Sequence, residues 1–410
     1  MKIINKVAIL ISWPRELDMF LEFAKSIKGY IIVIDDLVYT QNERFENGKK
    51  ILNLLNNKKI EYVLLSQVIG KIKYKVVFST AEAYQEKVTY YSYFKYIYSI
   101  SIGSFIQLSG LSRLFVNFFS HPLTGGGINA KTFIRHPVER EIGIKIIKYP
   151  KGLDINKALY PKNQWRSIFD YYLCHSEIDC NLITDKFPEA KCIKIGYPKY
   201  NSLLPKDSAK NIIYGDIASI NPSKPLILWM PTAIKINGKI IDNIKVWSPV
   251  ISRLLDKFNV LISLHPKLVV LEPEMVDYFK ELGFLVDIKK GRNLSVLYQS
   301  SDLVLADYGA SVLSTVYMKK KLILLNSSNQ KSIKWREERK YIDDDVRNDV
   351  SSFNINEGDS LVTQINKDIQ NSDNTKTDNL KKKYFGNEVN QKDIVKIIKD
   401  IVKIIKDLVS

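Results

Sequence analysis

The segment Ser300–Asn326 constrains the fold of this 410-residue chain more than any other part of it. Apolar runs at Leu303–Ala306 and Lys321–Leu325 predict two buried strands, and the residues between them predict a helix. The turn Asp307–Ser311 leads from the first strand into that helix. Its small residues leave backbone N–H groups open at the positive end of the helix dipole, which suits a phosphate. The segment therefore predicts a βαβ unit whose turn is either a phosphate site or a turn chosen for shape alone.

The same alternation of apolar strands and helices recurs along the chain. Continuous apolar strands separated by helices are typical of a parallel sheet that is covered on both faces. Strands are predicted in the first half at Val7–Ser12, Tyr30–Ile34 and Tyr62–Leu65, and in the second half at Leu226–Met230, Val260–Leu264, Leu285–Ile288, Leu303–Ala306 and Leu322–Leu325. A chain of this length exceeds one ordinary core, so two domains are expected.

The fold class that follows is α/β, with two Rossmann-like domains in the GT-B architecture and a cleft between them. We place an N-terminal acceptor-binding domain at residues 1–205 and a C-terminal donor-binding domain at residues 206–370. Residues 371–410 are expected to form a polar linker followed by a C-terminal amphipathic helix. That helix is predicted by a seven-residue repeat, Ile394–Asp400 and Ile401–Asp407, with apolar residues on one side. It would pack on a domain, pair with a second copy, or lie on an anionic membrane.

Composition narrows the class of partner. The net charge is +17 and the apolar residues make up 45% of the chain, so the protein is folded and its surface attracts anions. No zinc finger, RNA-binding signature or helix-turn-helix pattern is present, so nucleic acid is not an expected partner. Cys174, Cys180 and Cys192 lack a metal-ligand spacing and suit a reducing cytosol, so we expect them to be structural. The short apolar run before Trp13 is expected to be a first strand and not a secretion signal.

Two segments can each be interpreted either as purely structural or as functional. Residues between Lys95 and Arg113 carry no charge, which predicts either a buried helical hairpin or a surface that touches membrane or a lipid-linked acceptor. The acidic run Asp343–Asp345 has the residue type of a metal site. It follows a charged stretch and lies beyond the predicted sheet, so we interpret it as a solvated turn and expect no metal.

Three polar residues follow predicted strands of the second domain. Thr232, His265 and Asp307 each stand at a carboxyl end. Ligands of open α/β sheets bind outside the carboxyl ends of the strands. The three turns are therefore expected to meet in one site.

The order of these motifs resembles the bacterial CDP-glycerol glycerophosphotransferase family, the wall teichoic acid and capsule polymerases. The resemblance rests on Gly196-Tyr197-Pro198-Lys199, on the strand ends Pro231-Thr232 and His265-Pro266, and on Asp307-Tyr308 before a helix, and it covers roughly residues 140–330. It implies that the Asp-Tyr turn and the histidine surround the phosphates of the donor. Gly309 and Ala310 stand where the family has serines, with Ser311 one step later. The His-Gly dipeptide expected in the first domain is Lys151-Gly152 here.

With this resemblance the candidate site residues fall into three groups. The donor-binding candidates are Thr232, Lys267, Tyr308, Gly309, Ala310 and Ser311. The acceptor-binding candidates are His121 and the loop Gly125, Gly126 and Gly127. The catalytic candidates are His265, Asp307, Glu139 and Lys151. Lys235 and Arg292 are expected to be surface residues.

The identity of the general base stays undecided, because a lysine at the place of the family's histidine cannot accept a proton at an ordinary pKa of about 10.4. His121, His136 or a glutamate would substitute for it. Asp307 would either accept ribose or acceptor hydroxyls or fix its turn.

The expected function is transfer of a polyol phosphate or a sugar from a cytidine- or uridine-activated donor to a surface polysaccharide: capsule, teichoic acid or lipopolysaccharide O-antigen. A transferase that uses CMP-activated Kdo is the near alternative. A nucleotide-sugar epimerase and a non-catalytic polyanion-binding scaffold are the others. We expect no cofactor, a glycan or lipid-linked acceptor, a place on the inner face of the cytoplasmic membrane, and a homo-oligomer if the C-terminal helix pairs.

Overall fold

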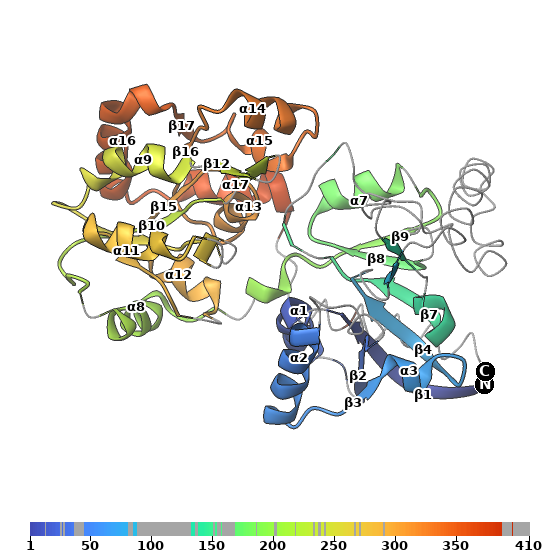
Figure 1. Cartoon of the computed structure of the whole chain (residues 1–410). Coiled ribbons are helices and arrows are strands. Elements are labelled where there is room, and N and C mark those ends of the chain that lie inside the picture. Colours follow the sequence, from blue (N-terminus) through green and yellow to red (C-terminus); the bar gives the residue numbers. More distant parts are fainter. Residues whose placement is uncertain are drawn as a thin grey trace. The chain divides into compact units, whose positions relative to one another are not determined.

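The structure is a computed structural model of the whole chain (Figure 1). It describes residues 1–12, 14–24, 27, 29–36, 45–80, 85–87, 133–135, 138–150, 152–153, 157, 169–185, 187–200, 203–217, 219–232, 234–236, 239–241, 243–265, 268–269, 272–289, 292–387 and 396. Its contacts divide the chain into two compact units. Unit 1 comprises Met1–Lys151, Leu159–Lys199 and Glu388–Ser410, and unit 2 comprises Gly152–Ala158 and Tyr200–Asn387.

Unit 1 is built on a parallel sheet with the strand order β3-β2-β1-β4-β7-β8-β9. The strands are β1 (Lys2–Ile11), β2 (Tyr30–Ile34), β3 (Tyr62–Leu64), β4 (Ile72–Ser79), β7 (Gly143–Lys148), β8 (Tyr171–Cys174) and β9 (Lys191–Lys194). The helices are α1 (Pro14–Ala24), α2 (Phe45–Asn57), α3 (Leu65–Val68), α6 (Val138–Ile142) and α7 (Glu177–Thr184), with a 3-10 turn at Pro198–Tyr200. Strand alternation sends Ile9 and Ile11 to one core and Ala8 and Leu10 to the other, so the sheet is buried on both faces.

Unit 2 repeats this design with the strand order β14-β13-β10-β15-β16-β17, again all parallel. The strands are β10 (Leu226–Met230), β13 (Asn259–Ile262), β14 (Leu285–Val286), β15 (Leu303–Ala306), β16 (Leu322–Leu325) and β17 (Ser351–Phe353). The helices are α8 (Lys206–Asp216), α9 (Asn243–Ser252), α11 (Glu274–Glu281), α12 (Leu294–Ser300), α13 (Ala310–Tyr317), α14 (Gln330–Glu337), α15 (Ile342–Val346), α16 (Gly358–Gln370) and α17 (Thr375–Phe385), with a 3-10 turn at Ile355–Glu357.

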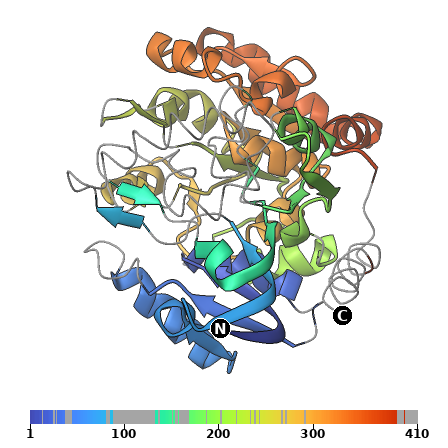
Figure 2. The same ribbon diagram turned by 90° about the vertical axis from the view of Figure 1, so that its right-hand side faces the viewer.

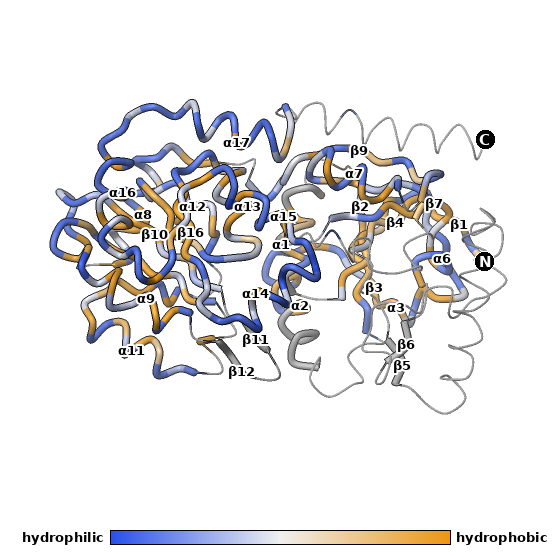
Figure 3. The backbone as a smooth tube through the Cα atoms, turned by 90° about the horizontal axis from the view of Figure 1, so that it is seen from above, coloured by the Kyte–Doolittle hydropathy of each residue, from blue (hydrophilic) through white to orange (hydrophobic). Residues whose placement is uncertain are grey.

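The apolar strands form the centre of each unit, as the sequence predicts. In the hydropathy-coloured view the strand segments are orange, whereas α17 is largely blue (Figure 3). Trp229 of β10 is buried beneath α11, with its ring 5.7 Å from Phe279 and 5.6 Å from Phe284. Two short antiparallel pairs stand apart from the sheets: β5 (Gln85–Lys87) with β6 (Phe133–Arg135), visible in Figure 2, and β11 (Ile234–Ile236) with β12 (Lys239–Ile241).

The expected polar linker at the start of residues 371–410 is wrong for its first part. Helix α17 occupies Thr375–Phe385 and buries Leu380, Tyr384 and Phe385. The Phe385 ring lies 5.0 Å from that of Tyr317 in α13, in an edge-to-face contact. Lysine-rich composition hid the few apolar residues, whose spacing puts them on one side of a helix. Unit 2 therefore continues to Asn387, beyond the expected limit at 370.

Two expectations fall on residues outside the described ranges. They are the amphipathic helix predicted at 394–410, of which only Lys396 is described, and the uncharged segment between Lys95 and Arg113. Within the described part of the chain, every helix is too short or too polar to cross a bilayer.

We predict that Phe385→Ala lowers the stability of unit 2 by about 3 kcal/mol, because a buried ring packed on another ring leaves a cavity. Urea unfolding followed by circular dichroism would measure this. Lys382→Ala, an exposed position on the same helix, is the matched control and should leave the midpoint unchanged. Equal midpoints for the two variants would mean that residues 375–385 act as the linker that composition suggests.

Candidate functional site

The carboxyl ends of the unit 2 strands bring the predicted turns to one edge of the sheet. Register pairs Met230 with Ala306, so the residues that follow β10 and β15 are neighbours. Thr232 is joined to the Asp307 turn directly: its N–H donates to Asp307 Oδ1 at 2.8 Å and its Oγ1 to the carbonyl of Tyr308 at 2.6 Å. His265 follows β13, which pairs with β10 on its other side, and it is half-buried at the same edge.

Asp307 holds the turn together. Its side chain is buried and accepts hydrogen bonds from the N–H groups of Thr232 and Tyr308, both at 2.8 Å, and from Asn243 Nδ2 at 3.4 Å. Burial raises the pKa of this carboxyl, and the hydrogen bonds act in the opposite direction. Of the two roles expected for Asp307, fixing the turn is the one that these contacts serve.

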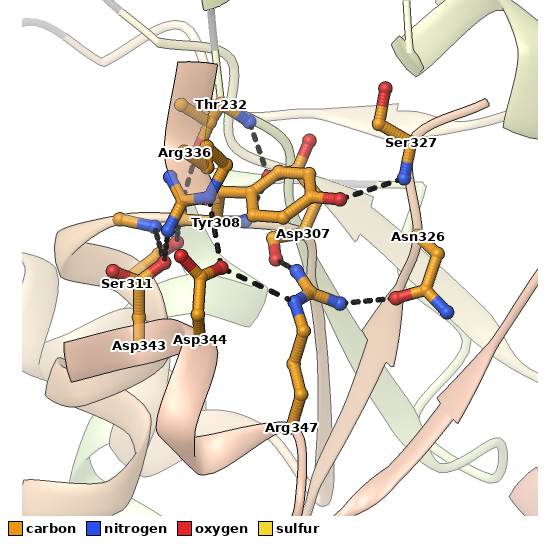
Figure 4. Close-up of polar contacts among 11 residues, drawn as sticks. Thr232, Asp307, Tyr308, Ser311, Asn326, Ser327, Arg336, Asp343, Asp344 and Arg347 are labelled. Carbon is orange, nitrogen blue, oxygen red and sulfur yellow. Dashed lines mark hydrogen bonds and ion pairs between the residues drawn. The ribbon is translucent and has the colours of Figure 1, made fainter. Parts of the chain in front are cut away.

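Tyr308 is clamped between two arginines (Figure 4). The guanidinium carbons of Arg336 and Arg347 lie 4.3 Å and 4.0 Å from the centroid of its buried ring. Its hydroxyl accepts the N–H of Ser327, after β16, at 2.9 Å. Arg347 also donates to the carbonyl of Asp307. Stacking and hydrogen bonds therefore fix Tyr308 as part of the wall of the site and turn its hydroxyl away from solvent.

The acidic run after α14 is not the solvated turn that the sequence suggests. Asp343 is 1% exposed, and its Oδ2 accepts the N–H of Gly309 at 2.7 Å and an ion pair from Arg336 at 2.5 Å. Asp344 pairs with Arg336 as well, at 2.9 Å, whereas Asp345 pairs nearer the surface with Lys157 at 2.6 Å. Composition marked these residues as polar, but a helix directs one carboxylate of three adjacent ones inward.

What remains open at this edge is the backbone at the start of α13. Ala310 is exposed, while Thr232, Gly309 and Ser311 are half-buried. Gly309 has a φ of +80°, which favours glycine, and a Cβ there would meet nothing closer than Thr232 Oγ1 at 3.9 Å. The first N–H groups of a helix have no partner within it, and the dipole favours negative charge there. The arrangement suits a phosphate group approaching Gly309–Ser311.

Several predicted residues lie elsewhere. The side chain of Arg292 is only 6% exposed and forms ion pairs with Asp216 and Asp287, at 2.7 Å and 2.8 Å, so it is a structural residue and not a surface one. Glu139 is buried in unit 1 and accepts a hydrogen bond from Ser79 Oγ at 2.9 Å. Lys151, Lys267, His121, His136 and Gly125–Gly127 lie outside the described residues, and for Lys235 only the backbone is described.

Unit 1 has a polar edge of its own that the sequence did not indicate. Buried polar side chains follow or end its strands: Ser12, Asp35, Ser79, Thr80, Lys148 and His175. His175 follows β8, and its Nδ1 lies 3.1 Å from Asp179 Oδ2, in the first turn of α7. Its Nε2 has no hydrogen-bond partner among the described residues. The ring packs edge-on against Tyr197, of the Gly196-Tyr197-Pro198 motif, at 4.9 Å.

An imidazole whose Nδ1 is held by a carboxylate is oriented for proton transfer at Nε2. A histidine directly after an apolar strand and four residues before an aspartate is the sequence signal that could have found this pair.

Two Rossmann-like units, each with polar residues at the carboxyl edge of a parallel sheet, define the fold class of GT-B transferases and nucleotide-sugar epimerases. A histidine-to-asparagine variant of the wall teichoic acid polymerase TagF superimposes with a TM-score of 0.56 at 14% identity, covering 99% of this chain and 90% of that one. The same polymerase soaked with CDPG gives 0.56 at 12% identity with the same coverage. A UDP-N-acetylglucosamine 2-epimerase gives 0.52 at 10% identity, covering 98% and 96%. These likenesses confirm the two predicted Rossmann-like domains.

The sequence itself identifies the family. Residues 139–398 match the model of the CDP-Glycerol:Poly(glycerophosphate) glycerophosphotransferase family, so the chain belongs to that family, as its motifs predict. No curated protein matches the sequence. The chain is accordingly an enzyme, a transferase of surface-polymer synthesis that uses a nucleotide-activated donor.

We predict that Asp343→Asn lowers the free energy of unfolding of unit 2 by about 2–4 kcal/mol, because it leaves a buried guanidinium without its closest counter-charge. Asp345→Asn, two residues on, removes a half-exposed ion pair and should cost less than about 1 kcal/mol. Chemical denaturation of the two variants side by side measures the difference. Equal, small losses would restore the solvated-turn interpretation.

Proposed function

We propose that the protein transfers a glycerol- or ribitol-phosphate unit from a cytidine-activated donor to a growing surface polymer. The observation that carries the proposal is the turn at Thr232 and Asp307–Ser311. It presents the N–H groups of Ala310 and Ser311 at the start of α13, while the charged side chains described around it, Asp307, Arg336, Asp343 and Arg347, are bound within the wall. Membership of the glycerophosphotransferase family supports the cytidine donor.

In this reaction an acceptor hydroxyl attacks the phosphorus atom that carries the polyol. A new P–O bond forms to the acceptor oxygen, and the P–O bond to the nucleoside monophosphate breaks. The nucleotide leaves with the electron pair, and the hydroxyl proton passes to a base. Charge develops on the leaving phosphate, where preorganised N–H groups and a helix dipole stabilise it without reorganising. We assign this role to the N–H groups of Ala310 and Ser311, with His265 and Thr232 on the same edge; the N–H of Gly309 is already bound by Asp343.

The basic side chains that the structure describes in this wall are already bound, which matters for specificity. Arg336 and Arg347 are held by Asp343, Asp344, Asn326 and the ring of Tyr308, so they support the turn. Binding at the described part of this edge would rely on backbone donors and on the half-buried His265. Lys267 stays a candidate for direct phosphate contact.

For the proton acceptor we propose His175, in place of the candidates Glu139 and Lys151. Its Nδ1 is fixed by Asp179 and its Nε2 is free to accept a proton in the matching tautomer. A buried polar atom without a partner costs about 1–3 kcal/mol, which calls for a functional reason. The polar carboxyl edge of unit 1 would then hold the acceptor, a glycan or a lipid-linked chain.

The remaining assignments complete the proposal. The enzyme would act on the inner face of the cytoplasmic membrane, where lipid-linked acceptors are anchored and where a net charge of +17 favours contact with anionic headgroups. The reaction as proposed uses no cofactor and no metal ion. Pairing through residues 394–410 would make a homo-oligomer.

A nucleotide panel tests the donor. CMP, CDP, UMP, UDP and GDP are each added to the protein, and the melting temperature is recorded. We expect CDP and CMP to stabilise the protein selectively, with a smaller effect for Gly309→Ala, which forces a side chain into a left-handed turn. Selective stabilisation by UDP would reject the cytidine donor. A response to CMP alone, with none to CDP, would favour a CMP-activated sugar such as Kdo.

The assignment of His175 is tested by turnover. His175→Gln is expected to lower kcat at least about 100-fold, the ordinary contribution of a positioned base, while KM for the donor stays near the wild-type value. Release of CMP from CDP-glycerol in the presence of acceptor measures both constants. His265→Gln is the matched comparison, since it should weaken donor binding as well. A normal kcat for His175→Gln would exclude this residue as the base.

A further inference from the structure

The three cysteines, scattered in sequence, converge in unit 1. Their Sγ atoms all lie within 4.8 Å of one another. Cys174 ends β8, Cys180 lies in the first turns of α7, and Cys192 lies in β9. These are all the cysteines of the chain.

Strand register explains the convergence. In the pair β8–β9, Cys192 is opposite Tyr172, and Cys174 stands two residues further along β8. Side chains two residues apart on a strand share a face, so Cys174 and Cys192 are diagonal neighbours on one face of the sheet. Helix α7 leads from β8 back to β9 and brings Cys180 to the same point. The sequence spacing of 5 and 11 intervening residues resembles no metal motif because this register creates the cluster.

We propose that Cys174, Cys180 and Cys192 form a binding site for one thiophilic metal ion, with Zn²⁺ as the first choice. Zinc–sulfur bonds of about 2.3 Å place tetrahedral sulfur atoms about 3.8 Å apart, so the thiols need to move by about 1 Å at most. Three thiolates leave one coordination position, which solvent fills. Cys174 and Cys180 are buried and Cys192 is half-buried, so Cys192 marks the side from which an ion and water enter.

The surroundings favour a cation over a purely structural cluster of thiols. Asp179 is 0% exposed, and it acts electrostatically on all three cysteines. Its Oδ2 is taken by His175, but its Oδ1 has no hydrogen-bond partner in the described part of the chain. The thiols themselves have only long contacts, 3.7 Å from Cys174 Sγ to the carbonyl of Tyr172 and 3.8 Å from Cys192 Sγ to that of Cys180. A bound cation would compensate the buried carboxylate and replace these weak contacts by bonds.

The consequence would be a clamp on the last strands of unit 1. The ion would tie β8, α7 and β9 together next to the segment that carries His175 and the Gly196-Tyr197-Pro198 motif. The proposal is independent of the donor and the transfer reaction, because its ligands lie in unit 1 and its test reads metal and thiols directly.

Zinc affinity is measured on the untagged full-length protein by competition with a chromophoric chelator, under a reductant that contains no thiol. We expect one equivalent of tightly bound Zn²⁺ in the wild type. Each of Cys174→Ser, Cys180→Ser and Cys192→Ser should weaken that binding at least about tenfold, the scale of loss for a disturbed metal ligand. Titration of the same protein with Cd²⁺ should give a thiolate-to-metal absorption band that the serine variants lose.

Ser176→Ala is the matched control, because it removes the hydrogen bond that caps α7 and keeps all three thiols. It should lower the melting temperature and retain stoichiometric zinc. Zinc should raise the melting temperature of the wild type and of Ser176→Ala but not that of Cys180→Ser. The proposal is wrong if the wild type binds no stoichiometric zinc, or if the serine variants bind it as tightly. It is also wrong if protein purified without reductant and then denatured shows one reactive thiol instead of three, which would identify a disulfide.

Discussion

The geometry of the candidate donor site depends on the buried carboxylate of Asp343. It fixes the N–H of Gly309 at the point where the chain turns into α13, and it balances the charge of Arg336. Arg336 in turn stacks on Tyr308, and Tyr308 binds the loop after β16 through Ser327. A chain of contacts thus runs from α15 through the turn to the next strand. Hydrogen bonds and ion pairs of this kind hold the turn in one geometry, and a phosphate site needs that rigidity.

Asp307 anchors the same turn from the other side. It receives the N–H groups of Thr232 and Tyr308 and so joins the ends of β10 and β15. The two carboxylates have different structural roles. Asp307 holds the turn against the ends of the strands, and Asp343 of α15 holds it at the start of α13. A substitution of Asp307 would therefore disturb the shape of the site along with any chemistry. The melting temperature of such a variant, together with its turnover, separates these effects.

The sequence predicted the parallel sheets well because apolar strands of β-branched and leucine residues have few alternatives. Leu303–Ala306 and Tyr30–Ile34 were predicted with their observed bounds, and membership of the family followed from the motifs at Gly196, Thr232, His265 and Asp307. The wall of the candidate donor site was not predictable in the same way. Asp343 lies 34 residues from Gly309 in sequence, and nothing in an acidic run states which carboxylate faces inward. Such contacts arise from tertiary packing, which local patterns do not encode.

In unit 1 as well, local sequence patterns did not reveal which residues come together. Its cysteines and His175 were easy to pass over because their significance depends on which residues β8, α7 and β9 bring together. Once register places Cys192 diagonal to Cys174, the thiols and the His175–Asp179 pair become neighbours built on the same strand and helix. Asp179 acts on both: its Oδ2 orients the imidazole, and its charge acts electrostatically on the thiols. A cation held by the thiols would therefore share this carboxylate with the proposed base.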